Sequence, residues 1–254
     1  MPTDDDVQNY ARALAQCSPS HYRTGPFTVR HNPDWETKYA NYAIPDQGAV
    51  PTAEDIAALV AAMRERGRLP RLEYLPACAP AVESALLAAG FTAENRASVL
   101  VCTPGTLLVP EPVAGLDIAE PATDAEFTTA AAVQHTGFGG EGGPEDGEIA
   151  WLRKATADGG ASALALLDGE PAGAGGCSAP MDGISELTGL AVAAGFRRRG
   201  VGAALAAWLT TTAFARGCRT VWLEPGDPDV ERIYAGIGYR RAGEKLNITL
   251  QPQA

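Results

Sequence analysis

The chain has 254 residues, 46% of them hydrophobic, which is enough apolar material for one large or two ordinary domains, and we expect two modest ones. Its net charge of −11 argues against nucleic-acid binding and favours cationic or neutral partners. No signal-peptide pattern, no run of about 18 apolar residues and no Cys-x-x-Cys pair occurs, so we expect a cytoplasmic protein without a membrane span, a disulfide framework or a zinc site.

The first half of the chain begins with acidic residues and a predicted helix start. The acidic residues 4–6 predict a frayed terminus. Residues 51–55, Pro-Thr-Ala-Glu-Asp, open a predicted helix with an acidic start, which stabilises a helix but repels a phosphate. The three histidines, His21, His31 and His135, are not spaced as metal ligands, so we interpret them as structural and expect no bound metal.

An internal repeat follows. A shift of 148 positions aligns residues 71–91 with residues 219–239 without a gap. The recurring residues are Arg71, Leu75, Pro80, Val82, Glu83 and Gly90, which match Arg219, Leu223, Pro228, Val230, Glu231 and Gly238. Repeats fix architecture, so the pattern predicts two related halves, 1–108 and 109–254, joined through the proline-containing stretch 104–112.

The second half starts with strand and helix patterns. They predict a strand at 116–122, helices at 124–136 and 144–157, and a hairpin that turns at residues 168–169. The loop 137–148 carries acidic residues that can attract an ammonium group, namely Glu141, Glu145, Asp146 and Glu148, but we interpret it as a mobile solvated loop. Residues 173–176, Gly-Ala-Gly-Gly, miss a dinucleotide fingerprint because Ser178 replaces its last glycine, and we expect a strand beside the cofactor.

Residues 184–217 carry the strongest functional signal. Residues 184–192 are apolar and β-branched and predict a buried strand, with a bulge or close backbone approach at Gly189. A glycine loop with three arginines follows, and residues 201–217 have the apolar period and final glycine of a helix. Unpaired amides and the helix dipole predict a phosphate site at this loop, which is neither a P-loop nor a dinucleotide fingerprint.

Residues 197–202, Arg-Arg-Arg-Gly-Val-Gly, resemble the Arg/Gln-x-x-Gly-x-Gly/Ala signature of the GNAT (GCN5-related) N-acetyltransferases. The predicted strand 219–223 and the following helix, which carries Tyr234 and ends at Gly238-Tyr239, are similar to the family's next elements, and the resemblance covers residues 116–250. Many members have an asparagine near the start of that helix, where this chain has Asp227, which we interpret as a helix cap.

The resemblance implies an α/β protein with a mixed sheet, the acyl-CoA N-acyltransferase fold, in two GNAT-like halves. The half at 1–108 is then a degenerate, shortened copy, because it lacks the arginine loop and has Leu86 where the other half has Tyr234. The half at 109–254 is the catalytic domain. The degenerate half would have a structural or acceptor-shaping role.

The resemblance also implies acetyl-CoA as the co-substrate. Its pantetheine would lie along the strand segment made by Leu190, Ala191 and Val192. Its diphosphate would lie on the loop made by Arg197, Arg198, Arg199, Gly200, Val201 and Gly202. The alternative for the three arginines is a solvated basic turn.

Two residues are candidates for the chemistry. Glu186 matches the family's strand glutamate, a general base; we expect its pKa to be raised by apolar neighbours of the same strand parity, namely Thr188, Leu190 and Val192. Tyr234 is the candidate acid that protonates the leaving thiolate. The alternatives are a solvated or ion-paired glutamate and a core tyrosine.

The sequence therefore predicts an N-acetyltransferase that moves an acetyl group from acetyl-CoA to the primary amine of a small molecule by direct attack in a ternary complex. An acyl-CoA-binding sensor without turnover and an acetyltransferase acting on protein N-termini or lysines are the alternatives. The acceptor stays open, because variable loops select it. A monomer and a homodimer are both compatible with the sequence.

Overall fold

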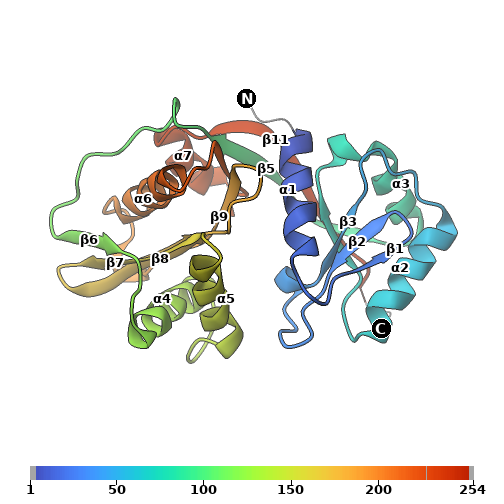
Figure 1. Ribbon diagram of the computed structural model, residues 1–254, viewed down its shortest axis with the longest axis horizontal. Helices are drawn as coiled ribbons and strands as arrows, with labels where there is room; N and C mark the ends of the chain where they lie inside the picture. The colour runs from blue at the N-terminus through green and yellow to red at the C-terminus, as the bar shows by residue number, and fades with distance from the viewer. Residues whose placement is uncertain (1–3, 227, 252–254) are drawn as a thin grey trace. The chain divides into compact units, whose positions relative to one another are not determined.

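The computed structural model describes residues 4–226 and 228–251, which form two compact units. The first contains residues 4–99 and 242–251, and the second contains residues 100–226 and 228–241. Both combine helices with parallel and antiparallel strands (Figure 1), which confirms the predicted α/β fold with a mixed sheet. No helix in the described part of the chain is long and apolar enough to cross a membrane.

The first unit is built on five neighbouring strands in the order β1-β2-β3-β4-β11. The strands are β1 (Tyr22–Thr24), β2 (Phe27–Arg30), β3 (Tyr42–Pro45), β4 (Arg71–Tyr74) and β11 (Arg240–Thr249). Strands β3 and β4 are parallel, whereas β11 is antiparallel to β4. Helices α2 (Ala53–Glu65) and α3 (Pro80–Ala88) contribute Leu59 and Leu86 to its apolar core.

Helix α1 (Asp4–Gln16) overturns the prediction of a frayed terminus at residues 4–6, because the helix begins with those residues. Val7 and Tyr10 are buried, and Gln8 accepts a hydrogen bond from the amide of Leu75 at 2.9 Å. Apolar side chains at Val7, Tyr10 and Leu14 are spaced as one face of a helix. That spacing was the signal that could have revealed the helix.

The repeat extends to the elements themselves. Helices α3 and α7 (Pro228–Gly236) and the starts of β5 (Thr92–Cys102) and β11 are each related by the shift of 148 residues. The last strand of each repeat pairs outside its own repeat: β11 pairs with β4, and residues 100–102 of β5 pair with β10 (Thr220–Leu223). Through this pairing, residues 242–251 belong to the first compact unit.

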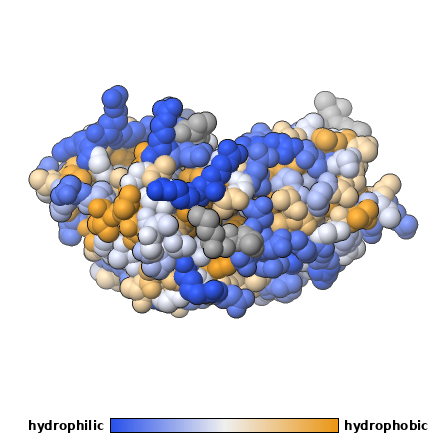
Figure 2. Space-filling model, turned by 90° about the horizontal axis from the view of Figure 1, so that it is seen from above, coloured by the Kyte–Doolittle hydropathy of each residue, from blue (hydrophilic) through white to orange (hydrophobic). Residues whose placement is uncertain are grey.

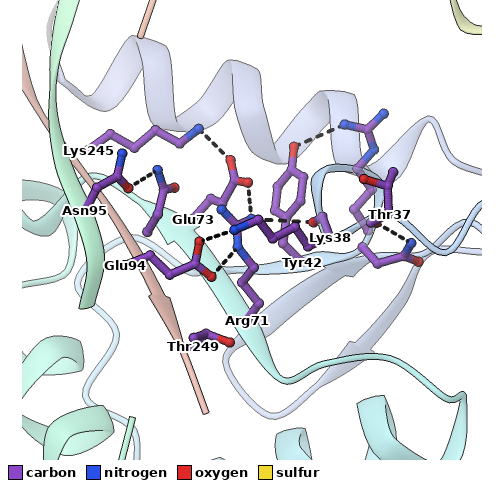
Figure 3. Close-up of polar contacts among 12 residues, drawn as sticks. Thr37, Lys38, Tyr42, Arg71, Glu73, Glu94, Asn95, Lys245 and Thr249 are labelled. Atoms are coloured by element: carbon purple, nitrogen blue, oxygen red, sulfur yellow. Dashed lines mark hydrogen bonds and ion pairs between the residues drawn. The ribbon is translucent and has the colours of Figure 1, made fainter. Parts of the chain in front are cut away.

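A chain of alternating charges ties β11 into the first unit (Figure 3). Lys245 of β11 contacts Glu73, which contacts Arg71, and Arg71 donates to Glu94 at 2.9 Å. Burial would raise the pKa of Glu73, but the charges of Lys245 and Arg71 lower it to about 2. Each buried charge therefore faces an opposite one, as burial in a low dielectric requires.

The second unit has the strand order β5-β10-β9-β8-β7-β6. Its further strands are β6 (Leu116–Ala119), β7 (Ala161–Leu167), β8 (Glu170–Cys177) and β9 (Ile184–Val192). Helices α4 (Asp124–Gly137) and α5 (Asp146–Ala157) form a core with one face of the sheet, and α6 (Val201–Ala215) and α7 form the main core with the other. These elements confirm the predicted order of strands and helices after residue 116.

The glycine-rich segment that resembled a dinucleotide fingerprint lies inside β8. A Cβ atom at Gly173 or Gly175 would crowd α6, coming within 3.2 Å of Val201 or 3.0 Å of Leu209. These glycines therefore let the long helix pack closely on the sheet. On the face seen in Figure 2, hydrophobic residues form small separated patches within a mainly hydrophilic surface.

Candidate active site

The loop between β9 and α6 presents a row of unpaired amides. Gly200 is the N-cap residue of α6 and has φ of 83°, and Arg198 has φ of 62°. Within the described residues, the backbone N–H groups of residues 198–203 donate to no acceptor, and no side chain caps the helix. Alternating left-handed residues and a helix start with its positive dipole end make an anion-binding concavity. The predicted phosphate loop has this geometry.

The three loop arginines are exposed. Arg197 donates from Nε to the carbonyl oxygen of Val192 at 3.2 Å. Arg199 lies 3.8 Å from the Asp168 carboxylate and 5.7 Å from the centroid of the Phe196 ring. Two of the three side chains thus have partners within the protein, whereas the backbone amides have none in the described part of the chain.

The pairing of β9 with β10 ends before this loop. Their parallel register covers three pairs, from Thr220 with Ile184 to Trp222 with Glu186. Leu190, Ala191 and Val192 lie beyond the end of that register. Within the described residues β10 therefore makes no ladder pair with this part of β9, which is the segment predicted to pair with pantetheine.

A bulge at Gly189, where φ is 64°, changes the face that β9 presents. Thr188 lines a cavity on the side of α4 and α5, whereas Leu190 and Val192 pack against the core that contains α6. The expected single face holding Glu186, Thr188, Leu190 and Val192 is therefore wrong, because the extra residue in the bulge reverses the alternation. Of these three expected neighbours, only Thr188 lies on the same side of the strand as Glu186.

Glu186 is half-buried and its backbone is fixed on both sides. Its amide donates to Oγ of Ser178 at 2.9 Å, and its carbonyl oxygen accepts from the Ser178 amide at 2.9 Å. Trp222, which is buried, lies opposite Glu186 in the register with β10. The carboxylate therefore projects from a rigid position in the sheet.

A cavity of about 40 Å³ adjoins the bulge. Its walls come from α4, α5, β8 and β9 and include Gln134, Trp151, Cys177 and Thr188. Gln134 donates from Nε2 to the carbonyl oxygen of Gly189 at 2.7 Å, which ties α4 to the bulge. The space is small, has an aromatic wall, and lies on the same side of β9 as Glu186.

A second cavity, of about 420 Å³, lies between α4 and the start of the arginine loop. Thr128, Ala132 and Thr136 of α4 form one wall, and Ala193 and Arg197 form the other. Arg197 was already a candidate coenzyme-binding residue, but the sequence did not predict the space itself, because its other wall comes from α4, about 65 residues away, whose residues carry no functional signal.

Tyr234 lies in the main core, only 6% exposed, with its ring edge-on to Tyr239 at 5.7 Å between centroids. Burial raises the pKa of Tyr234 to about 12, so its hydroxyl keeps its proton at neutral pH. Leu86, its counterpart in the repeat, is fully buried in the first unit. The tyrosine is thus both a core residue and a protonated donor.

The acidic loop is more ordered than predicted. Glu148 lies in the first turn of α5 and its carboxylate accepts from the amide of Glu145 at 2.8 Å, forming part of a capping box. His135 contacts that carboxylate through Nδ1 at 2.9 Å and the carbonyl oxygen of Glu141 through Nε2 at 3.1 Å. The carbonyl of Glu141 and the Glu148 carboxylate raise the pKa of His135. His135 therefore holds the segment 137–148 through contacts with Glu141 and Glu148.

Two further predictions concern ligands. Asp227, the predicted cap of the last helix, lies outside the described residues. Among the residues that the structure describes, no group of three or more His, Cys, Asp or Glu could hold a metal ion. Cys177, the cysteine next to the small cavity, is buried, and burial raises its thiol pKa, so it is not a ready nucleophile.

Both the sequence and the structure are similar to known proteins. Residues 127–239 match the model of the acetyltransferase (GNAT) family. The sequence has no match among curated proteins. The matched segment runs from α4 to the end of α7 and includes the arginine loop, Glu186 and Tyr234.

The structure is similar to a GCN5-related N-acetyltransferase from Kribbella flavida, with a TM-score of 0.83 and 24% identity over 100% of this chain and 97% of that one. It is also similar to an acetyltransferase of the GNAT family from Novosphingobium aromaticivorans, with a TM-score of 0.58 and 16% identity over 96% of each chain. A tandem GNAT protein from the clavulanic acid biosynthesis pathway matches with a TM-score of 0.60 and 11% identity over 100% of this chain and 98% of that one. These likenesses concern the fold along the whole chain.

Proposed function

We propose that this chain is an acyltransferase that moves an acetyl group from acetyl-CoA to the primary amine of a small molecule, a proposal supported by the match of residues 127–239 to the acetyltransferase (GNAT) family model. The amine nitrogen attacks the thioester carbonyl carbon directly, and the carbon–sulfur bond breaks. The observation that carries this proposal is the row of unpaired amides at residues 198–203, beside a strand edge that β10 leaves free.

The coenzyme fits this arrangement in two places. Its diphosphate would accept hydrogen bonds from the amides of the loop, where the α6 dipole favours negative charge. The extended pantetheine arm would pair with the edge of β9 at Leu190, Ala191 and Val192, which lie beyond the register with β10. Arg198 would add a charge at the loop, while Arg197 and Arg199 already have partners in the protein.

Glu186 is the proposed general base. The acceptor ammonium must lose a proton before it attacks, and a second proton leaves the nitrogen as the amide forms. By strand alternation Glu186 lies on the same side of β9 as Thr188, which lines the small cavity, and this cavity would receive the amine. A space of about 40 Å³ admits an amino group and a short stem beside Trp151, so the rest of the acceptor would extend outward.

Tyr234 is the proposed general acid. When the carbon–sulfur bond breaks, the thiolate needs a proton, and a phenol whose pKa is raised to about 12 carries one at every pH at which the enzyme works. The Tyr234 hydroxyl would give its proton to the coenzyme sulfur. Direct transfer needs no covalent enzyme intermediate, which agrees with the buried state of Cys177.

The test is release of coenzyme A from acetyl-CoA in the presence of a panel of small primary amines, with peptides carrying free N-termini and lysines as a second panel. The proposal expects turnover that depends on a small amine. Calorimetric binding of coenzyme A without turnover on any acceptor would instead indicate a sensor. Turnover on peptides alone would contradict the small-molecule acceptor.

A further inference from the structure

Residues 103–115, here called the connecting segment, join β5 to β6 and contain prolines at positions 104, 110 and 112. Figure 1 shows the segment leaving β5, passing α7 and α6 on their outer side, and ending at β6. Most of its side chains are exposed or half-buried, and Val109 is 74% exposed. Two of its residues, Leu107 and Val113, instead pack against the main core of the second unit.

The first contact lies at the end of the helix that carries Tyr234. The amide of Leu108 donates to the carbonyl oxygen of Ile237 at 3.0 Å. A Cβ atom at Gly238 would overlap the carbonyl oxygen of Thr106, so the backbone at Gly238 and the backbone of the connecting segment lie in van der Waals contact. This contact anchors the connecting segment to α7.

The second contact lies at the arginine loop. A Cβ atom at Gly200 would lie 3.0 Å from Cγ2 of Val113, which means that the valine rests against the glycine. Gly200 is the residue with φ of 83° that turns the loop into α6. Val113 therefore contacts the loop at Gly200. The backbone conformation of Gly200 sets the direction of the unpaired amides that follow it.

The end of the connecting segment also contacts the loop through the β7–β8 turn. The carbonyl oxygen of Gly115 accepts a hydrogen bond from the amide of Asp168 at 2.9 Å. Asp168 is in turn the residue whose carboxylate lies 3.8 Å from Arg199. Backbone and side chains thus connect residues 113–115 with the loop at both Gly200 and Arg199.

We propose that Val113 is a positioning residue for the coenzyme: held by the connecting segment, it fixes Gly200 and with it the amides that receive the diphosphate. This inference rests on the proposed function, since the ligand is coenzyme A. The segment that joins the two repeated halves then determines coenzyme affinity without touching the acetyl group or the amine.

The experiment compares four full-length proteins by calorimetry with coenzyme A and by steady-state kinetics. Val113→Ala removes the methyl groups that rest against Gly200, Val113→Thr keeps the branched shape, and Val109→Ala truncates an exposed residue of the same segment. We expect Val113→Ala to raise the Kd for coenzyme A and the KM for acetyl-CoA about three- to tenfold, with kcat and the KM for the amine unchanged. Val113→Thr keeps the branched shape, and its hydroxyl can reach water because residue 113 is only half-buried, so Val113→Thr and Val109→Ala should stay within about twofold of the wild type.

A merely structural role would lower the melting temperature of Val113→Ala and leave the Kd unchanged, and that result overturns the inference. A double-mutant cycle with Gly200→Ala sharpens the test, because the added methyl group meets Val113 directly. The double variant should lose less affinity than the two single variants together, and strictly additive losses contradict the contact. If the wild type itself binds no coenzyme A, the proposed function fails; if the wild type binds and Val113→Ala binds equally well, only this inference fails.

Discussion

The helices α2 and α6 follow the same kind of parallel strand in the two repeated halves, yet their first turns are opposite in chemistry. At α2, Thr52 accepts from the amide of Asp55 at 3.1 Å, and the Asp55 carboxylate accepts from the amide of Thr52 at 2.8 Å. At α6, the N-cap residue is Gly200, which has no side chain to accept a hydrogen bond. The amides of residues 198–203 are therefore unpaired in the described structure. A helix start that caps itself is stable and closed to anions, whereas an uncapped one keeps its donors for a ligand.

The same contrast extends to the helix that follows. Leu86 is an apolar side chain buried in the first core, whereas its counterpart Tyr234 places a hydroxyl group in the second core. In the first half, the helix cap and the buried leucine stabilise the fold. In the second half, the corresponding positions have an uncapped helix start and a buried hydroxyl, which are the groups that would bind and protonate a coenzyme. The predictions below test whether function resides in that difference.

The largest effect is expected from replacing Glu186. A loss of turnover in that variant would show that the second half carries the chemistry. Glu186→Gln removes the proposed base but keeps the hydrogen-bonding shape, so kcat should fall about 10²- to 10⁴-fold while the Kd for coenzyme A stays nearly unchanged. The measurement is steady-state kinetics with calorimetry on the same preparation. Unchanged turnover across the pH range would remove Glu186 from the mechanism.

Ala203→Asp would make the start of α6 resemble that of α2. Residue 203 is at the third helical position, as Asp55 is in α2, so its carboxylate would cap the free amides and repel a diphosphate. We expect coenzyme affinity to fall about 100-fold while thermal stability stays equal or rises. Ala203→Asn is the matched neutral control and should lose much less affinity. Equal affinity in Ala203→Asp and the wild type would contradict a diphosphate at these amides.

Tyr234 is tested by replacing it with its counterpart from the first half. Tyr234→Leu and Tyr234→Phe both keep an apolar core but remove the proton donor, so kcat should fall about 10- to 100-fold in each. Burial raises the folded-state pKa of Tyr234 to about 12, above the ordinary tyrosine value of about 10, so the stability tied to this proton is complete below about pH 10 and is lost as the pH rises towards 12. Both variants should lack that alkaline loss in denaturant titrations. Full activity of Tyr234→Phe at every pH would defeat the assignment.

The smallest effect is expected at the self-capped helix. Thr52→Ala removes the cap of α2 and should lower the free energy of unfolding by about 1 kcal/mol, with no change in coenzyme affinity. Chemical denaturation and calorimetry measure the two quantities. A loss of coenzyme affinity in this variant would mean that the first half takes part in binding.

The sequence predicts much of the region that carries function, because its signals are local. The observed β9 covers the predicted residues 184–192, and α6 begins at Val201 after the glycine loop, as its apolar period and its glycines indicated. The hairpin turn at Asp168 also matches, with φ of 54° there and 85° at Gly169. Each of these features depends on residues within a few positions of one another.

Features that depend on distant parts of the chain were not predictable. A bulge at Gly189 was anticipated, but its effect on the faces of Leu190 and Val192 depends on the register with β8. The pairing of β11 with β4 joins residues more than 170 positions apart, and no periodicity in either strand specifies that partner. The roles of Glu186 and Tyr234 and of the coenzyme-binding residues stay predictions.

The most direct test is an NMR titration of backbone amides with coenzyme A. The account predicts large shifts for the amides of residues 198–203 at the start of α6, and none for those of residues 53–55 at the start of α2. Unmoved amides at residues 198–203 in the presence of millimolar coenzyme A would contradict the central claim that this uncapped helix start binds the diphosphate.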